Sequence, residues 1–372
     1  MWHNKPVQLN NKDIGSNIVS CDVLYNKVIN ELDNSRFKLK YNVLYSKNLS
    51  REKMLEILDF INTNYIGSYN SDSYKFIYTI DLFEFFCKNA MILEFYPESN
   101  NKIVGYIVGK KSSIYLNDNV IRTSETNFLC LVPNLRNLGL GPFMINAFTK
   151  ELIDNWSIIT SHYTISDKIN SPYFGEKEFY NRYINLSNLN NSGYITLTNE
   201  IIKKYGKFGF PKYFCRYNIK YINGNFNDDE HIKILYDKYI DYCKRKYEIF
   251  ELIELDEFKS VFNNKSFHNF ILYDSEEIIG YICLFKLDLF NSSRVISNGY
   301  YYYMFFEDIR ILELVNKYMY DNNIFDVITF SDIFDINYDD IKCIKNKGMF
   351  RYYFYNIRCS VIKNDKNGLI TI

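Results

Sequence analysis

The sequence has few residues that build metal sites and no excess of charge of either sign. It holds four histidines, and its eight cysteines include no C-x-x-C pair, which argues against a zinc site and against a disulfide framework. Lys+Arg and Asp+Glu are equal at 44 each, so no overall field draws the chain to nucleic acid. The first residues, MWHNKPVQL, lack the apolar run of a signal peptide, and no stretch approaches the roughly 18 to 20 apolar residues of a membrane span. We expect a cytoplasmic protein with no metal, no nucleic-acid partner and no integral membrane segment.

The chain is long and apolar enough for a large core. Its 372 residues are 47% hydrophobic, which suits two domains or one large one. Two stretches repeat a pattern of turn, Ile, Ile/Val, Gly, Tyr, Ile: FYPESNNKIVGYIVGKK at 95–111 and LYDSEEIIGYICLFK at 272–286. Each reads as a β-hairpin, with Gly105 and Gly280 in equivalent places. The repeat predicts two similar halves, and the alternative is chance likeness in an Ile- and Tyr-rich chain.

A helix is expected ahead of each hairpin, and a strand followed by a helix after it. In the first helix Ser50 is the N-cap, and Met54, Leu55, Leu58 and Ile61 form the buried face. The second helix buries Ile232, Leu235, Tyr236 and Tyr239. We predict an α/β fold of two tandem halves with mixed, strongly twisted sheets flanked by helices, divided as 1–200 and 201–372 in the stretch between Ser187 and Gly224. The absence of a low-complexity linker predicts a shared interface.

The stretch NFLCLVPNLRNLGLGPFMINAF, residues 127–148, combines a strand, a glycine turn and an amphipathic helix. Gly139 and Gly141 let the turn aim backbone N–H groups at a phosphate near the helix N-terminus, and Pro142 is tolerated in the first helical turn. The motif is neither a P-loop nor a dinucleotide fingerprint. The order of strand, Arg-x-x-Gly-x-Gly and helix resembles the pyrophosphate loop of the GNAT superfamily of acyl-CoA N-acyltransferases, which implies bound CoA. The alternative is a tight turn with no ligand.

A more specific resemblance covers nearly the whole chain. ETNFLCLVPNLRNLGLGPFMI is similar to the signature of the glycylpeptide N-myristoyltransferase family, and the flanking segments follow in the family's order. They are MWHNKPV, HYT at 162–164, FYNRYIN at 179–185, GYYYY at 299–303, IFDVITFSDI, FRYYFYN and the final GLITI. The resemblance implies two GNAT-like halves, the first binding myristoyl-CoA and the second contributing most of the peptide groove. It also accounts for the internal repeat.

The resemblance implies transfer of a myristoyl group from myristoyl-CoA to the amino group of an N-terminal glycine. The backbone amides of Phe128 and Leu129 would form the oxyanion hole, although from the residues alone both are strand residues of the core. The carboxylate of Ile372 would be the base, with Asn127 and Thr164 holding the glycine ammonium. The apolar ending GLITI suits insertion into the core, and the alternative is a terminal edge strand buried for stability.

Two further groups of residues carry the family's binding roles by resemblance. The CoA contacts would be Trp2, Leu131, Arg136, Asn137, Leu138, Gly139, Leu140, Gly141 and Pro142. The peptide contacts would be Tyr74, Phe76, Tyr78, Tyr163, Tyr180, Asn181, Tyr301 and Asp332. For Trp2 the alternative is a hydrophobic plug, and for the tyrosines and Phe76 it is core packing.

The chain departs from the family pattern at three binding segments, one of them FYNRYIN, where Tyr180, Asn181 and Tyr183 replace the family's Trp, His and Ser. Asn137, Leu138 and Gly139 replace the family's Ser-Lys-Arg, so two cations of the phosphate loop are lost and CoA is held less electrostatically. IGSYNSDS at 66–73 replaces an acidic run, and Asp72 alone keeps its charge, so a preference for basic peptide residues is not expected to carry over.

The function that we infer is N-myristoylation by direct attack, without a covalent acyl-enzyme and without a cofactor other than the acyl donor. Cys130 follows the oxyanion strand, but no histidine partner is near it in sequence, so an inert buried thiol is favoured over a nucleophile. Two other functions stay open: an acyltransferase with another acyl chain or amine, and a non-catalytic binder of acyl-CoA or glycine-ended peptides. The expected partners are proteins or peptides with an N-terminal glycine, and the expected state is a monomer.

Overall fold

The computed structural model describes residues 17–37, 39–65, 75–169, 171–206, 217–291, 294–333 and 338–370. Among these residues no helix is both long enough and apolar enough to cross a membrane. The segments that carry Trp2, the acidic-run replacement at 66–73, Tyr74 and Ile372 lie outside the described residues.

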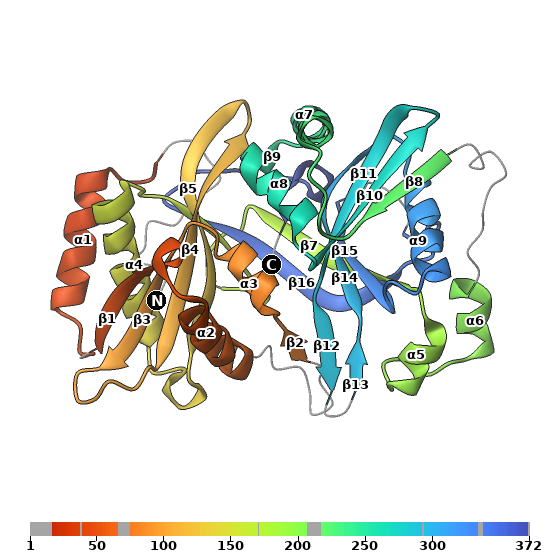
Figure 1. Ribbon diagram of the computed structural model, residues 1–372. Coiled ribbons are helices and arrows are strands. Elements are labelled where there is room, and N and C mark those ends of the chain that lie inside the picture. The colour runs from red at the N-terminus through yellow and green to blue at the C-terminus, as the bar shows by residue number, and fades with distance from the viewer. Residues whose placement is uncertain are drawn as a thin grey trace.

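Two similar units of secondary structure follow each other along the chain (Figure 1). The first, residues 39–165, contains β1 (Leu39–Tyr45), α2 (Arg51–Asn64), β2 (Lys75–Ile77), α3 (Ile80–Phe86), β3 (Ala90–Pro97), β4 (Gly105–Leu116), β5 (Asn119–Leu131), α4 (Leu140–Trp156) and β6 (Ser161–Ile165). The second, residues 217–331, contains β8 (Tyr217–Ile222), α7 (Asp229–Lys246), β9 (Ile249–Glu251), α8 (Leu255–Asn263), β10 (Phe267–Asp274), β11 (Glu277–Lys286), β12 (Asp288–Asn291), β13 (Arg294–Ile296), β14 (Asn298–Phe306), α9 (Ile311–Asp321) and β15 (Val327–Ser331).

The remaining elements precede, join or follow these two units. They are α1 (Cys21–Asp33), the 3-10 turns η2 (Ser46–Asn48) and η3 (Pro133–Leu135), β7 (Gly175–Tyr183), α5 (Leu186–Asn191), α6 (Asn199–Tyr205), β16 (Ile344–Tyr355) and the 3-10 turn η5 (Asn364–Lys366).

The repeat seen in the sequence is confirmed as a structural repeat. The strand order β1-β3-β4-β5-β6 of the first unit matches β8-β10-β11-β14-β15 of the second, and in each unit the last pair, β5–β6 or β14–β15, is parallel. Both sequence motifs form the expected hairpins, β3–β4 and β10–β11. The predicted α/β fold of two similar halves is therefore confirmed.

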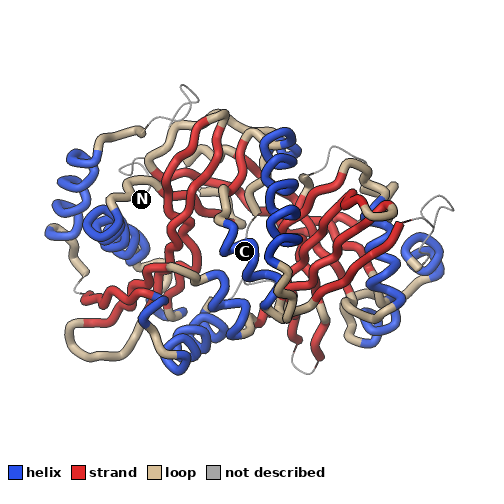
Figure 2. The backbone as a smooth tube through the Cα atoms, turned by 45° about the horizontal axis from the view of Figure 1, so that its top comes forward, coloured by secondary structure: helices blue, strands red, loops and turns tan. Residues whose placement is uncertain are grey.

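One sheet joins the two units by an exchange of strands. In the order β6-β16-β7-β15, β7 follows the first unit but pairs with β15, and β16 follows the second unit but pairs with β6. Figure 1 shows β16 running across the centre of the molecule, and Figure 2 shows strands continuing through both halves with helices on their flanks. The division at residue 200 stays a prediction, because this sheet crosses it.

The largest core cluster also spans both units. It joins α2 and α3 to α7, α8 and the strands β10, β11 and β14. The ring of Phe85 on α3 packs 4.5 Å from the ring of Phe267 on β10, and Phe86 packs 5.4 Å from Phe285 on β11. Aromatic contacts therefore bind the two units together through a continuous apolar core.

Local signals in the sequence predicted α2 and α4, but one residue of α2 was assigned to the wrong face of the helix. Ser50 caps α2, and its side chain accepts a hydrogen bond from the amide of Lys53. The helix predicted after the glycine turn forms as α4, and its apolar residues Met144, Ala147, Phe148 and Leu152 are all buried. On α2, however, Leu55 is 45% exposed, and Ile57 takes its place in the core. The apolar stripe turns toward the position of Ile57, because α2 packs against both α3 and β5.

Candidate functional site

A bulge in β5 lies at the centre of the site. The register of β4 and β5 passes from Val108 opposite Asn127 to Tyr106 opposite Cys130, so it skips Phe128 and Leu129. Phe128 has φ +48°, a left-handed conformation that a bulky residue rarely adopts inside a strand. The bulge displaces the backbone groups of Phe128 and Leu129 from the ladder. Such strain inside a strand is typical of a functional position.

Aromatic packing holds the bulge in place. The ring of Phe128 is 3% exposed and makes edge contacts with Tyr65, Tyr78 and Phe83 at centroid distances of 5.6, 5.3 and 5.4 Å. The side chain of Leu129 points the other way and is 40% exposed. The buried ring therefore fixes the backbone conformation of the two amides that follow Asn127.

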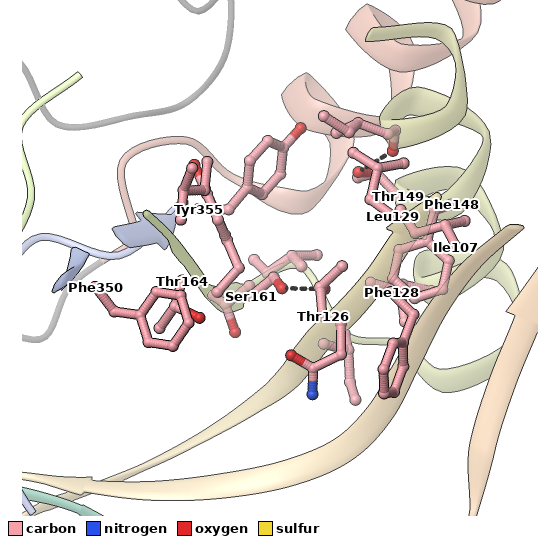
Figure 3. A pocket seen from close by; sticks show the side chains of 18 of the residues that line it. Ile107, Thr126, Phe128, Leu129, Phe148, Thr149, Ser161, Thr164, Phe350 and Tyr355 are labelled. Atoms are coloured by element: carbon pink, nitrogen blue, oxygen red, sulfur yellow. Dashed lines mark hydrogen bonds between the residues drawn. The ribbon is translucent and has the colours of Figure 1, made fainter. Parts of the chain in front are cut away.

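The parallel strands β5 and β6 separate next to the bulge and leave a cavity. They pair only at Ser124–Ser161 and Glu125–His162. The hydroxyl oxygens of Thr126 and Ser161 then share a hydrogen bond of 2.6 Å, drawn in Figure 3. Beyond it lies a cavity of about 340 Å³, within the range of small-molecule sites. Asn127, Phe128, Leu129, Tyr163 and Thr164 all line it, so five of the predicted site residues meet in one cavity.

The walls of the cavity are mostly apolar, and three elements contribute to them besides β5 and β6. Helix α4 contributes Ile145, Phe148, Thr149 and Leu152, β4 contributes Ile107, and β16 contributes Phe350 and Tyr355. Figure 3 shows Ile107, Leu129 and Phe148 on one side of the cavity, with Phe350 and Thr164 on the other. This lining suits an aliphatic chain, since few polar groups would lose water when one binds.

The predicted phosphate loop leads from β5 into α4. Asn137 and Gly139 both have positive φ, +62° and +86°, and α4 begins at Leu140 with Pro142 in its first turn. No side chain caps the helix, and its first turn contains no acidic residue. The first amides of α4 are therefore available to an anion, which the helix dipole also favours.

The two arginines at the loop have different roles. Arg136, predicted from the sequence, donates from Nε to the carbonyl of Leu131 at 3.0 Å and from Nη2 to the carbonyl of Asn64. It therefore ties the loop to the ends of β5 and α2. Arg36, which the sequence did not reveal, donates from Nη2 to the carbonyl of Leu138 at 3.1 Å and is otherwise exposed. Arg36 thus places a cation beside a loop that lacks two of the family's own.

Four predicted peptide contacts lie together, away from the cavity, where β7 meets β15. Tyr180 stacks on Tyr338 at 3.9 Å, and the ring of Tyr301 meets Phe330 edge-on at 5.4 Å. Asn181 is 4% exposed, donates to the hydroxyl of Tyr194 and accepts from Thr329. The fourth, Asp332, accepts hydrogen bonds from the amide of Glu178 and from the Asn364 side chain.

Two further peptide contacts, Phe76 and Tyr78, belong to the first unit. Phe76 on β2 is 45% exposed, with its ring 6.2 Å from that of Tyr300. Tyr78 is buried against Phe128. Tyr163 lines the cavity. Among the other described peptide candidates, Phe76 is therefore the one with an exposed side chain.

A buried charged cluster lies behind Asn127 and was not expected from the sequence. Lys110, opposite Glu125 across β4 and β5, donates to Glu257 at 2.6 Å and to Glu251 at 3.3 Å. Burial, reinforced by the charge of Glu251, raises the pKa of Glu125 to about 7 against the pull of Lys110, and Glu125 is hydrogen-bonded to the side chain of Asn127. The cluster thus contains a carboxyl, that of Glu125, whose pKa is near neutral pH and which is hydrogen-bonded to Asn127 in the cavity wall.

The histidine and cysteine nearest the cavity are poorly suited to catalysis. Burial lowers the pKa of His162 to about 4, so its ring is uncharged at neutral pH. Burial also raises the pKa of the Cys130 thiol to about 12, and the nearby Arg136 opposes this only in part. Among the described residues, no group of three or more His, Cys, Asp or Glu side chains could hold a metal ion.

Comparisons with known proteins agree with the fold. Residues 22–174 match the family described as myristoyl-CoA:protein N-myristoyltransferase, N-terminal domain. A glycylpeptide N-tetradecanoyltransferase of Plasmodium falciparum is 23% identical over 400 residues, covering 100% of this chain and 93% of the relative. A relative from Amsacta moorei entomopoxvirus is 26% identical over 310 residues, covering 81% of this chain and 95% of its own.

Solved structures share the overall fold. Saccharomyces cerevisiae N-myristoyltransferase with bound myristoyl-CoA superposes with a TM-score of 0.79 over 98% of this chain and 89% of the yeast chain, at 16% identity. The fold and the relatives together define an acyltransferase. The chain is similar to N-myristoyltransferases along its whole length.

Proposed function

We propose that this protein transfers a myristoyl group from myristoyl-CoA to the α-amino group of an N-terminal glycine. The observation that carries the proposal is the β5 bulge at Phe128 and Leu129, which lies at a cavity that Asn127 and Thr164 also line, in a chain similar to N-myristoyltransferases. The first half would bind the acyl donor and the second would contribute most of the peptide groove.

The acyl donor is proposed to lie across the loop and the cavity. The pyrophosphate of CoA would sit on the first amides of α4, with the helix dipole and Arg36 favouring its charge. The acyl chain would occupy the apolar cavity beside Phe148 and Leu152 (Figure 3). The thioester carbonyl would then lie at the bulge, between the two binding regions.

The chemistry requires stabilisation of charge on the carbonyl oxygen. As the amine attacks, a C–N bond forms and the oxygen gains negative charge, which the amides of Phe128 and Leu129 would stabilise. The C–S bond then breaks and CoA leaves as a thiol after taking one proton. The bulge supports this assignment, because the ladder register skips Phe128 and Leu129 while both residues stay within β5.

The glycine amine must lose a proton before it attacks, since its free pKa is about 7.7 to 8. We assign the proton acceptor to the carboxylate of Ile372, with Asn127 and Thr164 orienting the amine. Burial of the residues just before it supports the assignment: Leu369 is 3% exposed, and Ile370 packs against the core that joins the two units. A site that admits an α-carbon only without Cβ would account for glycine specificity.

Direct attack is proposed in preference to an acyl-enzyme. The only cysteine next to the bulge within the described chain, Cys130, is 2% exposed and stays a thiol at neutral pH. It therefore lacks the thiolate that a nucleophile needs.

Mass spectrometry tests the proposal directly. The untagged protein is incubated with myristoyl-CoA and an octapeptide that begins Gly-x-x-x-Ser, beside the same peptide beginning with Ala. A gain of one myristoyl group on the glycine peptide alone supports the reaction. Modification of both peptides, or faster reaction with a shorter acyl-CoA, would favour an acyltransferase of other specificity. Absence of product with myristoyl-CoA bound would favour a non-catalytic binder.

A further inference from the structure

Lys177 lies on β7, in the middle of the shared sheet, with none of its surface exposed. Its Nζ donates a hydrogen bond of 2.7 Å to the carbonyl oxygen of Leu369 and lies 5.3 Å from the ring centre of Tyr352. Within the part of the chain that the structure describes, Lys177 forms no ion pair. Asp332 acts on it only at longer range.

A lysine is an unfavourable residue at this position unless its amine has a specific use. Burial lowers the pKa of Lys177 to about 7, because a desolvated ammonium is poorly stabilised. A methionine would fill similar space without that penalty. What lysine adds is an N–H donor to Leu369, and both the charged and the neutral amine provide it.

Leu369 belongs to a terminal segment, residues 364–370, that is attached at several points. Asn364 donates to Asp332 at 2.6 Å, and the amide of Gly368 donates to the carbonyl of Ile249 at 2.7 Å. The carbonyl of Leu369 accepts from Lys177 and also from the hydroxyl of Tyr352 at 3.2 Å. Among the hydrogen bonds described for the segment, this double attachment is the one nearest the chain end.

The attachment lies next to the cavity wall. Lys177 stands opposite Phe350 on β16, and Tyr352 stands opposite Thr164 on β6. Directly opposed residues share a face of the sheet, and both Phe350 and Thr164 line the cavity. Three residues follow Leu369, so the terminal carboxylate lies within about 11 Å of the held carbonyl by the reach of an extended chain.

We infer that Lys177 is a positioning residue: by holding the carbonyl of Leu369, it fixes the point from which the chain continues to its terminal carboxylate. This inference rests on the proposed function, in which that carboxylate takes the proton of the glycine amine. The lysine would act through the segment it holds and would not touch the substrate.

The first test measures the attachment itself. Full-length untagged protein is treated with carboxypeptidase A, and loss of Ile372 and Thr371 is followed by intact mass. The Lys177→Met variant should lose these residues about tenfold faster than wild type. Tyr352→Phe, which removes the weaker donor without removing a buried amine, should show a smaller increase. The exposed Lys233→Met on α7 serves as the matched control and should digest at the wild-type rate.

The second test measures the consequence for catalysis. Lys177→Met should lower kcat about 10- to 100-fold, as expected for a misplaced catalytic group. The Kd for myristoyl-CoA should stay at the wild-type value, and thermal stability should be equal or higher. If Lys177 had only a structural role, Lys177→Met would instead lower stability and acyl-CoA binding together with kcat.

Deletion of Ile372 completes a double-mutant cycle. If Lys177 acts through the carboxylate, Lys177→Met should have no further effect on the residual rate of the deletion variant. Multiplicative losses would overturn the inference, as would an unchanged digestion rate in Lys177→Met. A wild-type kcat in the deletion variant would overturn the proposed base itself, and the positioning role with it, whatever the digestion shows. Transfer chemistry and the role of Lys177 are therefore tested separately.

Discussion

The hydroxyls of Thr126 and Ser161 share a 2.6 Å hydrogen bond at the last point where β5 and β6 run side by side. On one side of this bond the two strands pair, and on the other they diverge around the cavity. The site is thus made by a bulge and a divergence of strands within a sheet. Groups held by a sheet are positioned more precisely than groups on loops, which suits a reaction that depends on orientation.

Arg36 should contribute to CoA affinity. Its guanidinium donates to Leu138 and lies over the Phe37 ring at 5.0 Å, beside the first turn of α4. We expect Arg36→Met to raise the Kd for CoA about fivefold, or about 1 kcal/mol, and to weaken the salt dependence of binding, while kcat with saturating acyl-CoA is unchanged. Isothermal titration with CoA at two salt concentrations measures this.

The control for Arg36 is an arginine in a similar exposed setting. Arg245 on α7 is 65% exposed and pairs with Glu307 at 2.8 Å. Arg245→Met should leave the Kd for CoA unchanged at both salt concentrations. Equal effects of the two variants would mean that Arg36 acts only through the net charge of the protein.

Cys130 should be dispensable for turnover. Its thiol is buried and protonated at neutral pH, so Cys130→Ala is expected to keep kcat within twofold and to lose roughly 1 kcal/mol of stability. Wild-type protein mixed with myristoyl-CoA alone should show no covalent gain in intact mass. A stable variant with a hundredfold lower kcat, or an acyl adduct on the wild type, would point instead to an acyl-enzyme.

Local sequence signals predicted the parts of the site that are continuous in the chain. The strand, glycine turn and helix of 127–148 were found because each depends on neighbouring residues: a left-handed Gly139, a tolerated Pro142 and an apolar helix face. Leu55 was assigned to the wrong face, since the packing of α3 and β5 against α2, and not the periodicity alone, decides which residues are buried.

Contacts between distant segments could not be predicted in this way. Arg36 meets Leu138 across 102 positions, and Lys177 meets Leu369 across 192. Both depend on tertiary arrangement, the second on the insertion of β16 between β6 and β7. An isolated lysine in a strand gives no sign that it will be buried. The charged cluster of Lys110, Glu251 and Glu257 was missed for the same reason, because its members come from different units.

Glu125 should make stability depend on pH. Burial raises its folded pKa to about 7, above the unfolded value near 4.3, so the native state binds more protons between these values and loses stability as pH rises through them. At pH 5 the protonated carboxyl resembles glutamine, whereas at pH 8 it is ionised near Glu251. We expect Glu125→Gln to stabilise the fold by about 1 to 2 kcal/mol at pH 8 and by little at pH 5. Urea unfolding at both pH values measures this.

Other charged groups face Glu125, so the comparison needs a control. Lys110 favours the ionised form, and Glu257 opposes it. The exposed Glu98, in the turn between β3 and β4, provides the matched substitution. Glu98→Gln should change stability equally at pH 5 and pH 8. A Glu125→Gln variant that is less stable than wild type at pH 8 would mean that Lys110 dominates and that the folded pKa of Glu125 lies below its unfolded value.

Gly368 should be intolerant of even one methyl group, because the terminal segment runs against a buried ring. A Cβ at this position would lie 2.4 Å from Cδ2 of Tyr247, whose side chain is 7% exposed. Gly368→Ala must therefore shift the segment that precedes the terminal carboxylate or the ring beside it.

We expect kcat to fall about 10- to 100-fold with the Kd for myristoyl-CoA unchanged, because none of the described residues of the terminal segment lines the acyl cavity. Adding Tyr247→Leu should make room and recover part of kcat, at some loss of stability. A Gly368→Ala enzyme with wild-type kcat would show that the position of the terminal segment does not limit the reaction.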